Sequence, residues 1–407
     1  MKDRIIVGVD LGSSKICGVV GERNEAQDIK LIGKISVNAR GIEAGIIKDQ
    51  VLAAEALNKL FKELQALTGR ELTEAYITVP SGICTLVPVR GNIDINSPDR
   101  IIGKRELARV KDAAGLLVIP SDIRALDIII DKYNIDDKMT TKSPYRMKGD
   151  KLELIGKMVQ IKSNIYNSYK DCFASIHKSL MGIRISCEAA SEILIDDLDK
   201  NRGVVLVDVG KDKTDIAIYN EGSLKTVEKI PLGGNNITKD LSYCFKVPPE
   251  EAENLKLSLA NNAYLEENKN IDLNMARDII EARTDEIVEF IDNLLKKYHN
   301  GNDISNIVIY GRGIPFNRKN KEKFIKLFDK NINFVGGDDL NLINSQYINS
   351  WGLVNLIEHE LKWKYDRENV NSKVIEENVI KNITEKSKRR EKDGIISKMK
   401  SLLEDLF

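Results

Sequence analysis

The stretch VGVDLGSSKI (Val7–Ile16) decides the fold, because a second version of it, VLVDVGKDKT (Val205–Thr214), occurs in the other half of the chain. In each, a run of β-branched and other apolar residues ends in Asp-x-Gly, and another apolar run follows. This order predicts a strand, a tight turn and a second strand. A single Asp-x-Gly turn is commonly an ordinary hairpin, but a pair of them indicates a duplicated fold.

The two turns have the chemistry of a phosphate site. Glycine lets the backbone approach a ligand closely, and the N–H groups of a turn can face an anion. An aspartate can hold a hydrated divalent cation. Two facing copies would clamp a nucleoside triphosphate with its Mg²⁺, so we expect Asp10 and Asp208 to hold the metal through water.

Composition excludes several other classes of protein. Lys plus Arg and Asp plus Glu number 62 each, so no overall positive field attracts nucleic acid. The five cysteines are scattered without a Cys-x-x-Cys pair, and the three histidines share no ligand spacing, which disfavours disulfide frameworks, zinc sites and Ser/His triads. The first strand begins directly after Met1–Arg4, and no apolar run approaches ~18 residues. We therefore expect a protein that stays inside the cell.

At 407 residues the chain predicts more than one domain. The pattern of apolar residues predicts a three-stranded meander over residues 5–37 and further strands at Ala75–Val79, Val87–Ile95, Leu152–Ile161 and Asn306–Tyr310. It predicts helices at Lys48–Thr68, Arg105–Leu117, Tyr166–Met181 and Asn349–Leu361. The stretch from Leu241 to His299 is predicted to be mostly helical. The expected domains are a first half (1–85 and 164–197), an inserted α/β subdomain (86–163), a second half (198–240 and 303–365), a helical subdomain (241–302), a polar linker (366–393) and a terminal helix (394–407).

The last fourteen residues, GIISKMKSLLEDLF, predict an amphipathic helix. At ~100° per residue its large apolar side chains fall in one arc, from about 340° to 120°, and its polar side chains lie outside that arc. At ~1.5 Å per residue the helix is about 21 Å long, so it could lie on a bilayer of ~30 Å core but not span it. The apolar residues are Ile395, Ile396, Met399, Leu402, Leu403, Leu406 and Phe407.

The alternative for this helix is packing on its own domain or on a partner helix. The long polar linker disfavours the first, and the basic residues among 386–392 favour an anionic membrane surface. One copy would bind a membrane marginally, whereas many copies on one polymer would bind by avidity.

With these motifs the chain resembles the actin-like ATPase superfamily and, within it, the FtsA family of bacterial cell-division proteins, over nearly its whole length. The first phosphate turn of that family matches at Asp10, Gly12, Ser13, Ser14 and Lys15, and the family's water-orienting acid matches at Glu188, although Ala189 stands where a proline is usual. The most specific match is Pro144-x-x-Met147-x-Gly149-x-x-Leu152-Glu153 in the insertion. Pro231-Leu232-Gly233-Gly234-Asn235 and Ala252-Glu253-x-x-Lys256 resemble the segments that line the ribose and adenine.

The resemblance implies a duplicated, two-domain actin-like α/β fold that binds ATP or ADP with Mg²⁺. It implies catalytic roles for Glu188, Asp10 and Asp208. The nucleotide-binding residues that it implies are Asp10, Gly12, Ser13, Ser14, Lys15, Asp208, Gly210, Lys213, Thr214, Gly233, Gly234, Asn235, Glu253, Lys256, Gly311, Arg312 and Gly313. Without the resemblance, Glu253 and Lys256 would be an ordinary surface pair at i, i+3.

Two departures from the family pattern bear on activity. The second phosphate turn is usually Asp-x-Gly-Gly-Gly-Thr-Thr-Asp, whereas here Lys211, Asp212 and Lys213 interrupt it. These residues lose the freedom of glycine at positive φ and add side chains; Lys211 or Lys213 could offer a charge to phosphates, while Asp212 would repel them if it faced the site. Arg312 replaces a usual glycine and could stack on the base or obstruct it. We expect nucleotide binding with slow or absent hydrolysis.

The resemblance further implies an adaptor that polymerises on the inner face of the cytoplasmic membrane at the division site. There it would tether the tubulin-like protein FtsZ, whose C-terminal peptide docks on the helical subdomain in this family. Alternatives are an actin-like scaffold of pilus or secretion machinery and a small-molecule kinase of the same superfamily. A kinase would need an acid–base pair in the insertion, which the sequence lacks, and would have no use for the terminal helix. An Hsp70-type chaperone is disfavoured because only linker and tail follow the duplicated halves.

Overall fold

The computed structural model describes residues 5–24, 28–140, 143–260, 271–298, 304–314, 322, 325, 331–335 and 345–362. The chain divides into two compact units, Met1–Leu356 and Ile357–Phe407. The expected polar linker, the terminal amphipathic helix and all of its proposed membrane-binding residues lie outside the described residues.

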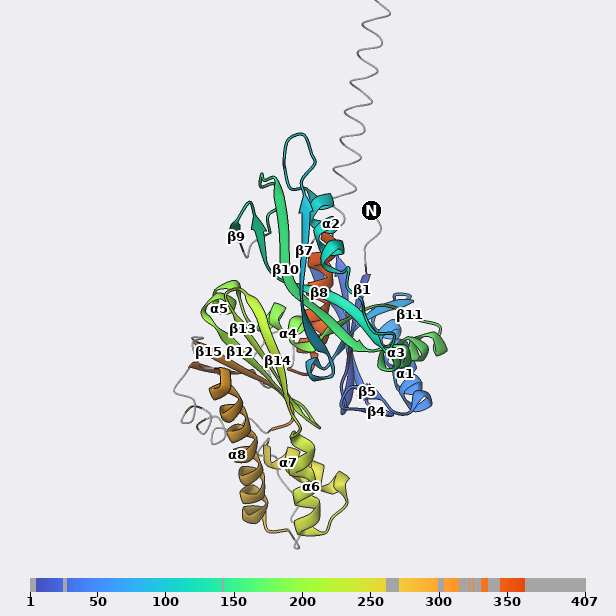
Figure 1. The fold of residues 1–407 in the computed structure, drawn as a ribbon. Helices are drawn as coiled ribbons and strands as arrows, with labels where there is room; N and C mark the ends of the chain where they lie inside the picture. Colours follow the sequence, from blue (N-terminus) through green and yellow to red (C-terminus); the bar gives the residue numbers. More distant parts are fainter. Residues whose placement is uncertain are drawn as a thin grey trace, which may run out of the picture. The chain divides into compact units, whose positions relative to one another are not determined.

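The first half is built on a five-stranded sheet of order β11-β6-β1-β2-β3 (Figure 1). Its strands are β1 (Ile5–Leu11), β2 (Lys15–Arg23), β3 (Ile29–Asn38), β6 (Glu74–Val79) and β11 (Ser179–Ile185). The first three pair antiparallel, and β6 and β11 extend the sheet in parallel, which confirms the predicted meander. Helix α1 (Gln50–Thr68) packs on β2 and β3, and the Asp49 side chain caps it by accepting from the N–H groups of Val51 and Leu52.

The second half repeats this arrangement with order β14-β13-β12-β15-β16. Its strands are β12 (Val204–Val209), β13 (Thr214–Asn220), β14 (Ser223–Ile230), β15 (Asn306–Gly311) and β16 (Asn331–Phe334). Again three strands form an antiparallel meander, and two further strands continue the sheet in parallel. The duplication predicted from the two turns is confirmed.

A separate four-stranded sheet interrupts the first half. It has the order β7-β10-β8-β9, with β7 (Thr85–Asp94), β8 (Ile123–Ile135), β9 (Lys138–Thr140) and β10 (Lys151–Lys162). Helix α2 (Lys104–Ala114) covers it so closely that a Cβ atom on Gly91 would lie 2.4 Å from the carbonyl oxygen of Val110. Strand β8 was not predicted, because most of its side chains are half-buried and apolar and polar residues do not alternate along it.

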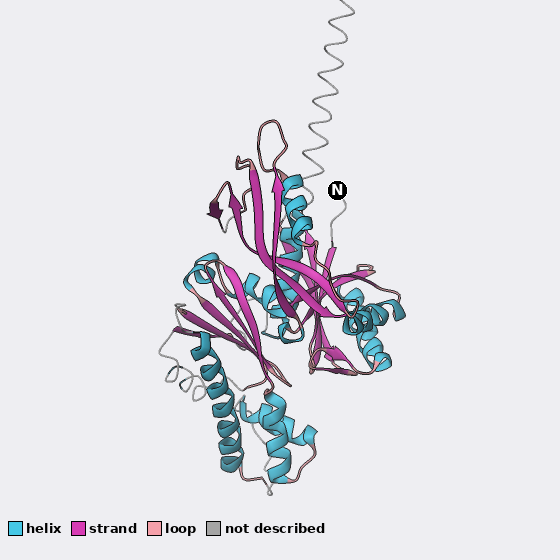
Figure 2. Ribbon diagram, in the orientation of Figure 1, coloured by secondary structure: helices cyan, strands magenta, loops and turns pink. Residues whose placement is uncertain are grey.

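Helices α6 (Gly234–Phe245), α7 (Pro249–Ala260) and α8 (Leu273–Tyr298) form an all-helical region with its own apolar cluster (Figure 2). The remaining elements are β4 (Ile42–Glu43), β5 (Ile46–Ile47), η1 (Ser81–Ile83), α3 (Ser163–Ser175), α4 (Ser186–Leu194), α5 (Asp197–Arg202), η2 (Ser345–Tyr347) and a helix over 348–362. Within the described part of the chain, no helix is both long and apolar enough to cross a membrane.

The helix predicted over Tyr166–Met181 is wrong at its C-terminal end. Helix α3 ends at Ser175, and His177 adopts a positive φ of 56° that an α-helix cannot contain. The following residues pair with β6 as strand β11. Likewise α2 ends at Ala114, three residues before the predicted Leu117.

Candidate functional site

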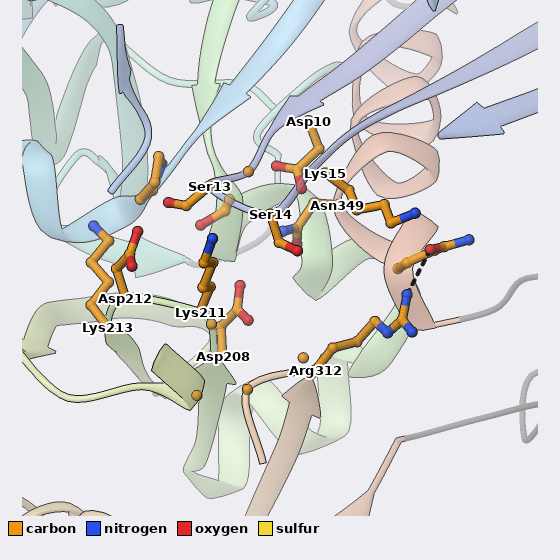
Figure 3. A pocket seen from close by; sticks show the side chains of 18 of the residues that line it. Asp10, Ser13, Ser14, Lys15, Asp208, Lys211, Asp212, Lys213, Arg312 and Asn349 are labelled. Atoms are coloured by element: carbon orange, nitrogen blue, oxygen red, sulfur yellow. Dashed lines mark hydrogen bonds between the residues drawn. The ribbon is translucent and has the colours of Figure 1, made fainter. Parts of the chain in front are cut away.

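A cavity of about 240 Å³ lies between the two halves, where β1 and β12 end in their Asp-x-Gly turns (Figure 3). Most of the predicted nucleotide-binding residues line it. They are Asp10, Gly12, Ser13, Ser14, Lys15, Asp208, Gly210, Lys213, Gly234, Glu253, Lys256, Gly311, Arg312 and Gly313. The predicted residues Thr214, Gly233, Asn235 and Glu188 do not line the cavity.

Two carboxylates, Asp10 and Asp208, project into the cavity from equivalent places in the two sheets. Burial raises the pKa of Asp10 to about 6, although hydrogen bonds from Thr78 and Asn349 favour its ionised form. Burial, together with the negative charges of Asp215 and Asp10, raises the pKa of Asp208 to about 7. The Asn349 side chain hydrogen-bonds both carboxylates, so it lies between them.

These groups fit a hydrated Mg²⁺. Two carboxylates and an amide supply the oxygen ligands that hard cations take, and Mg²⁺ keeps several of its waters. The Oδ1 atom of Asn349 is buried and has no hydrogen-bond partner in the part of the chain that the structure describes, so it is available to a metal-bound water. Among the described residues no group of three His, Cys, Asp or Glu side chains could hold a cation directly. A cation held through water by Asp10 and Asp208 suits this arrangement.

The interrupted second phosphate turn does not require the lost glycines. No residue of Asp208–Asp215 has positive φ, so the lysines and the aspartate fit the turn without backbone strain. Lys213 Nζ lies 3.4 Å from Asp215 Oδ2, and the Asp215 Oδ1 atom accepts from the N–H of Gly82 at 3.2 Å.

Asp212 is also engaged by protein groups. Its Oδ2 atom accepts from the N–H of Ala44 at 3.3 Å, and its Oδ1 atom accepts from Asn235 Nδ2 at 3.3 Å. Because Ala44 and Gly82 belong to the first half, the carboxylates of Asp212 and Asp215 both join the second turn to the first half. All three inserted residues line the cavity, and Lys211 extends toward Ser13 and Ser14 (Figure 3).

Glycines let three backbone turns meet beside the cavity. A Cβ atom on Gly313 would lie 2.1 Å from the Gly210 carbonyl oxygen, and one on Gly234 would lie 2.4 Å from the Gly313 carbonyl oxygen. Gly233 has the same role, since its Cβ would lie 2.6 Å from the Gly210 carbonyl oxygen. Gly233 was predicted to bind the nucleotide; in the structure, the atoms closest to it belong to protein backbone.

Thr214 and Asn235 are structural in the same sense. Thr214 is fully buried, and its hydroxyl donates to the carbonyl of Leu232 at 2.9 Å. The backbone N–H of Asn235 donates to the carbonyl of Lys211 at 2.6 Å. Both residues hold the turn in place rather than facing the cavity.

Glu253 and Lys256 are not the ordinary surface pair that their spacing alone would suggest. Lys256 is 3% exposed, and its Nζ donates to the Gly234 carbonyl at 3.1 Å, to Thr238 Oγ1 at 3.0 Å and to Glu253 Oε2 at 2.7 Å. Burial lowers the pKa of Lys256, and hydrogen bonding to Glu253 opposes this change. With all three ammonium protons used, Lys256 orients Glu253 and the start of α6.

Arg312 lines the cavity, whereas Glu188 is not among the lining residues. The Nη1 of Arg312 donates to Gln346 Oε1 at 2.9 Å, which holds the guanidinium toward η2 (Figure 3). Glu188 is in the first turn of α4. The sequence reasoning missed Gln346 and Asn349; the only signal for Asn349 was a polar residue at the start of an apolar helix.

Two family models match the sequence. "Cell division protein FtsA" matches residues 205–390, and "SHS2 domain inserted in FTSA" matches residues 84–160. Among curated relatives, the cell division protein FtsA of Bacillus subtilis (strain 168) is 28% identical over 72% of this chain and 70% of its own length. The FtsA of Borreliella burgdorferi is 28% identical over 65% of each chain, and that of Escherichia coli (strain K12) is 23% identical over 62% of this chain and 60% of its own.

Solved structures resemble the fold. A chain of the PilM–PilN type IV pilus biogenesis complex matches with a TM-score of 0.61 and 14% identity, over 86% of this chain and 97% of its own. The crystal structure of MreB5 of Spiroplasma citri bound to ADP matches with a TM-score of 0.53 and 13% identity, over 88% and 98%. At these identities the likeness concerns the fold alone, and that fold is actin-like.

Proposed function

The chain belongs to the family of the cell division protein FtsA, and from this membership we propose that it is a division adaptor. It binds ATP or ADP with Mg²⁺, self-associates into filaments on the inner face of the cytoplasmic membrane and tethers FtsZ there. We also propose that the chain is organised as the sequence predicts, into two halves, an insertion, a helical subdomain, a linker and a terminal helix.

The observation that carries nucleotide binding is the convergence of both phosphate turns on one cavity. Asp10 and Asp208 approach it from equivalent strands, with Asn349 between them. Gly12, Ser13 and Ser14 form the turn after β1 and line the cavity, and the successive amides of such turns commonly bind anions. When bound, Mg²⁺ would neutralise phosphate charge at this pair of carboxylates.

Slow or absent hydrolysis is supported by the residues around the second turn. Lys213 and Asp215 pair with one another, and Asp212 is hydrogen-bonded to Ala44 and Asn235. Glu188, the acid expected to orient water, is not among the lining residues. Turnover by the full chain comparable with that of a sugar kinase would contradict this part of the proposal.

FtsZ binding is assigned to the region of α6–α8, following the family. This region has an apolar core of its own, built from residues such as Ile237, Leu241 and Ile280. Membrane binding is assigned to the amphipathic residues of 394–407.

Liposome sedimentation tests the adaptor function. The full chain should pellet with anionic liposomes and carry FtsZ with it, whereas a chain ending at Lys392 should stay in the supernatant. Leu403→Asp places a charge in the apolar arc and should abolish pelleting; Ser401→Asp places the same charge on the polar face and is the matched control. If the full chain and the shortened chain both stay in the supernatant with FtsZ present, the adaptor function is wrong.

The pilus or secretion scaffold is the second candidate, because a chain of a pilus biogenesis complex shares the fold. The two functions separate in the same experiment. An adaptor of division carries FtsZ into the pellet in proportion to its own amount, whereas a scaffold of the other class leaves FtsZ behind even when the chain itself pellets.

A further inference from the structure

The cavity is lined by five cationic side chains, of which three are engaged by protein groups. Lys213 pairs with Asp215, and Lys256 donates to three acceptors. Arg312 donates to Gln346. The remaining two are Lys15 and Lys211.

Lys15 and Lys211 extend to opposite sides of the cavity (Figure 3). Lys211 is exposed and reaches from the second turn toward Ser13 and Ser14 of the first. In the described part of the chain the structure provides no acceptor for its ammonium. Its charge nevertheless acts inside the site, since it contributes to the lowered pKa of Lys256.

Hydrogen bonds hold the backbone of Lys211 in place, so the position from which its side chain extends is fixed. The Lys211 carbonyl accepts from the N–H of Asn235 at 2.6 Å, and the adjacent Gly210 is fixed by bonds to Lys213 and Gly234. The neighbouring Asp212 also lines the cavity, and its carboxylate accepts hydrogen bonds from Ala44 and Asn235. The Lys211 side chain thus starts in the second phosphate turn, reaches toward the first, and places there a positive charge that no described residue pairs with.

We propose that Lys211 binds the terminal phosphates of the nucleotide and supplies part of the positive charge that Mg²⁺ otherwise provides. This inference rests on the proposed nucleotide binding. A lysine ammonium is a compact charge with three donors, and its hydrogen bonds to phosphate are of the strong, charge-assisted kind. In that position its charge would favour triphosphate over diphosphate. Nucleotide binding to this chain is therefore only partly dependent on Mg²⁺.

The test measures the affinity of the full chain for ATP and ADP by calorimetry, once with saturating Mg²⁺ and once with EDTA. Lys211→Met removes the charge at similar size and should weaken ATP binding about tenfold in EDTA, and less in Mg²⁺, from the typical strength of hydrogen bonds to charged groups. Lys211→Arg should retain most of the affinity. Lys239→Met removes an exposed lysine of α6 outside the cavity and should change nothing.

The outcomes separate the two proposals. If the unaltered chain binds neither ATP nor ADP in saturating Mg²⁺, nucleotide binding itself is wrong. If it binds in Mg²⁺ but loses all binding in EDTA, or if Lys211→Met binds ATP as the unaltered chain does under both conditions, the role of Lys211 is wrong. Thermal unfolding of each variant checks that affinity changes do not come from loss of the fold.

Discussion

At the scale of single residues, Asp10 and Asp208 link nucleotide binding to pH. Their pKa values of about 6 and about 7 lie above the ordinary value of 3.8. These groups therefore stabilise the ligand-free fold most at acidic pH, and that contribution is lost as the pH rises through 6 and 7. A bound cation needs both groups ionised, so binding with Mg²⁺ must release the protons they hold.

We accordingly predict that affinity for Mg²⁺–nucleotide falls as the pH is lowered from 8 to 5.5, by roughly tenfold per pH unit for each proton released. Calorimetry in two buffers of different ionisation enthalpy measures the released protons directly. Asp208→Asn should abolish most of the release, and comparison with it cancels protonation of the nucleotide itself. Equal heats in the two buffers at pH 6.5 would contradict the prediction.

At the scale of elements, the start of α6 depends on glycines at its contacts with the two other turns. The contact at Gly313 is the tightest of the three, because its Cβ would lie only 2.1 Å from the Gly210 carbonyl oxygen, which belongs to the backbone and not to a flexible side chain. Any side chain there must separate the turns after β12 and β15. That separation would widen the cavity beside Asp208.

Gly313→Ala should therefore lower the free energy of unfolding by about 1–3 kcal/mol, as overpacking commonly does, and weaken nucleotide binding. Denaturant unfolding and calorimetry measure the two effects. Gly115→Ala is the control, because Gly115 ends α2 with φ −79° and its Cβ would approach no heavy atom closer than 3.2 Å. An unchanged midpoint for Gly313→Ala would show that the turns are not held together by this contact.

Elements were predictable from sequence where the period was clear. The meander and α1 have strong apolar patterns, and the Asp-x-Gly pair predicted both the duplication and the carboxylates of the cavity. Strand β8 was missed because it is half-buried, and β11 because its parallel pairing with β6 outweighs local helical preference. Asn349 and Gln346 could not be found, since only tertiary structure brings that segment to turns more than a hundred residues away.

At the scale of the whole described unit, the two halves contact each other through the second phosphate turn. Asp212 and Asp215 both accept N–H groups of the first half, from Ala44 and Gly82. These contacts depend on how the halves face one another, so no local pattern could have predicted them. They join the two halves beside the cavity in which we propose that phosphate binds.

Asp212→Ala should weaken this closure and increase the rate at which nucleotide dissociates, about five- to tenfold for the loss of a hydrogen bond to a charged group. Stopped-flow displacement of a fluorescent nucleotide measures that rate. Asp196→Ala, which removes the N-cap of α5 and lies outside the cavity, is the control. A dissociation rate unaffected by Asp212→Ala would mean that the cross-cavity bond does not limit opening.

The hydrogen bonds that Asp212 and Asp215 accept from the first half also bear on how long an assembled subunit would stay closed. If a subunit closes only around a triphosphate, hydrolysis of that triphosphate opens the subunit and so limits how long it stays assembled. A subunit whose halves are joined by its own carboxylates would not depend on hydrolysis in this way. In the filaments that we propose for this chain, disassembly would then depend on another protein or on loss of the membrane surface rather than on hydrolysis by the chain itself.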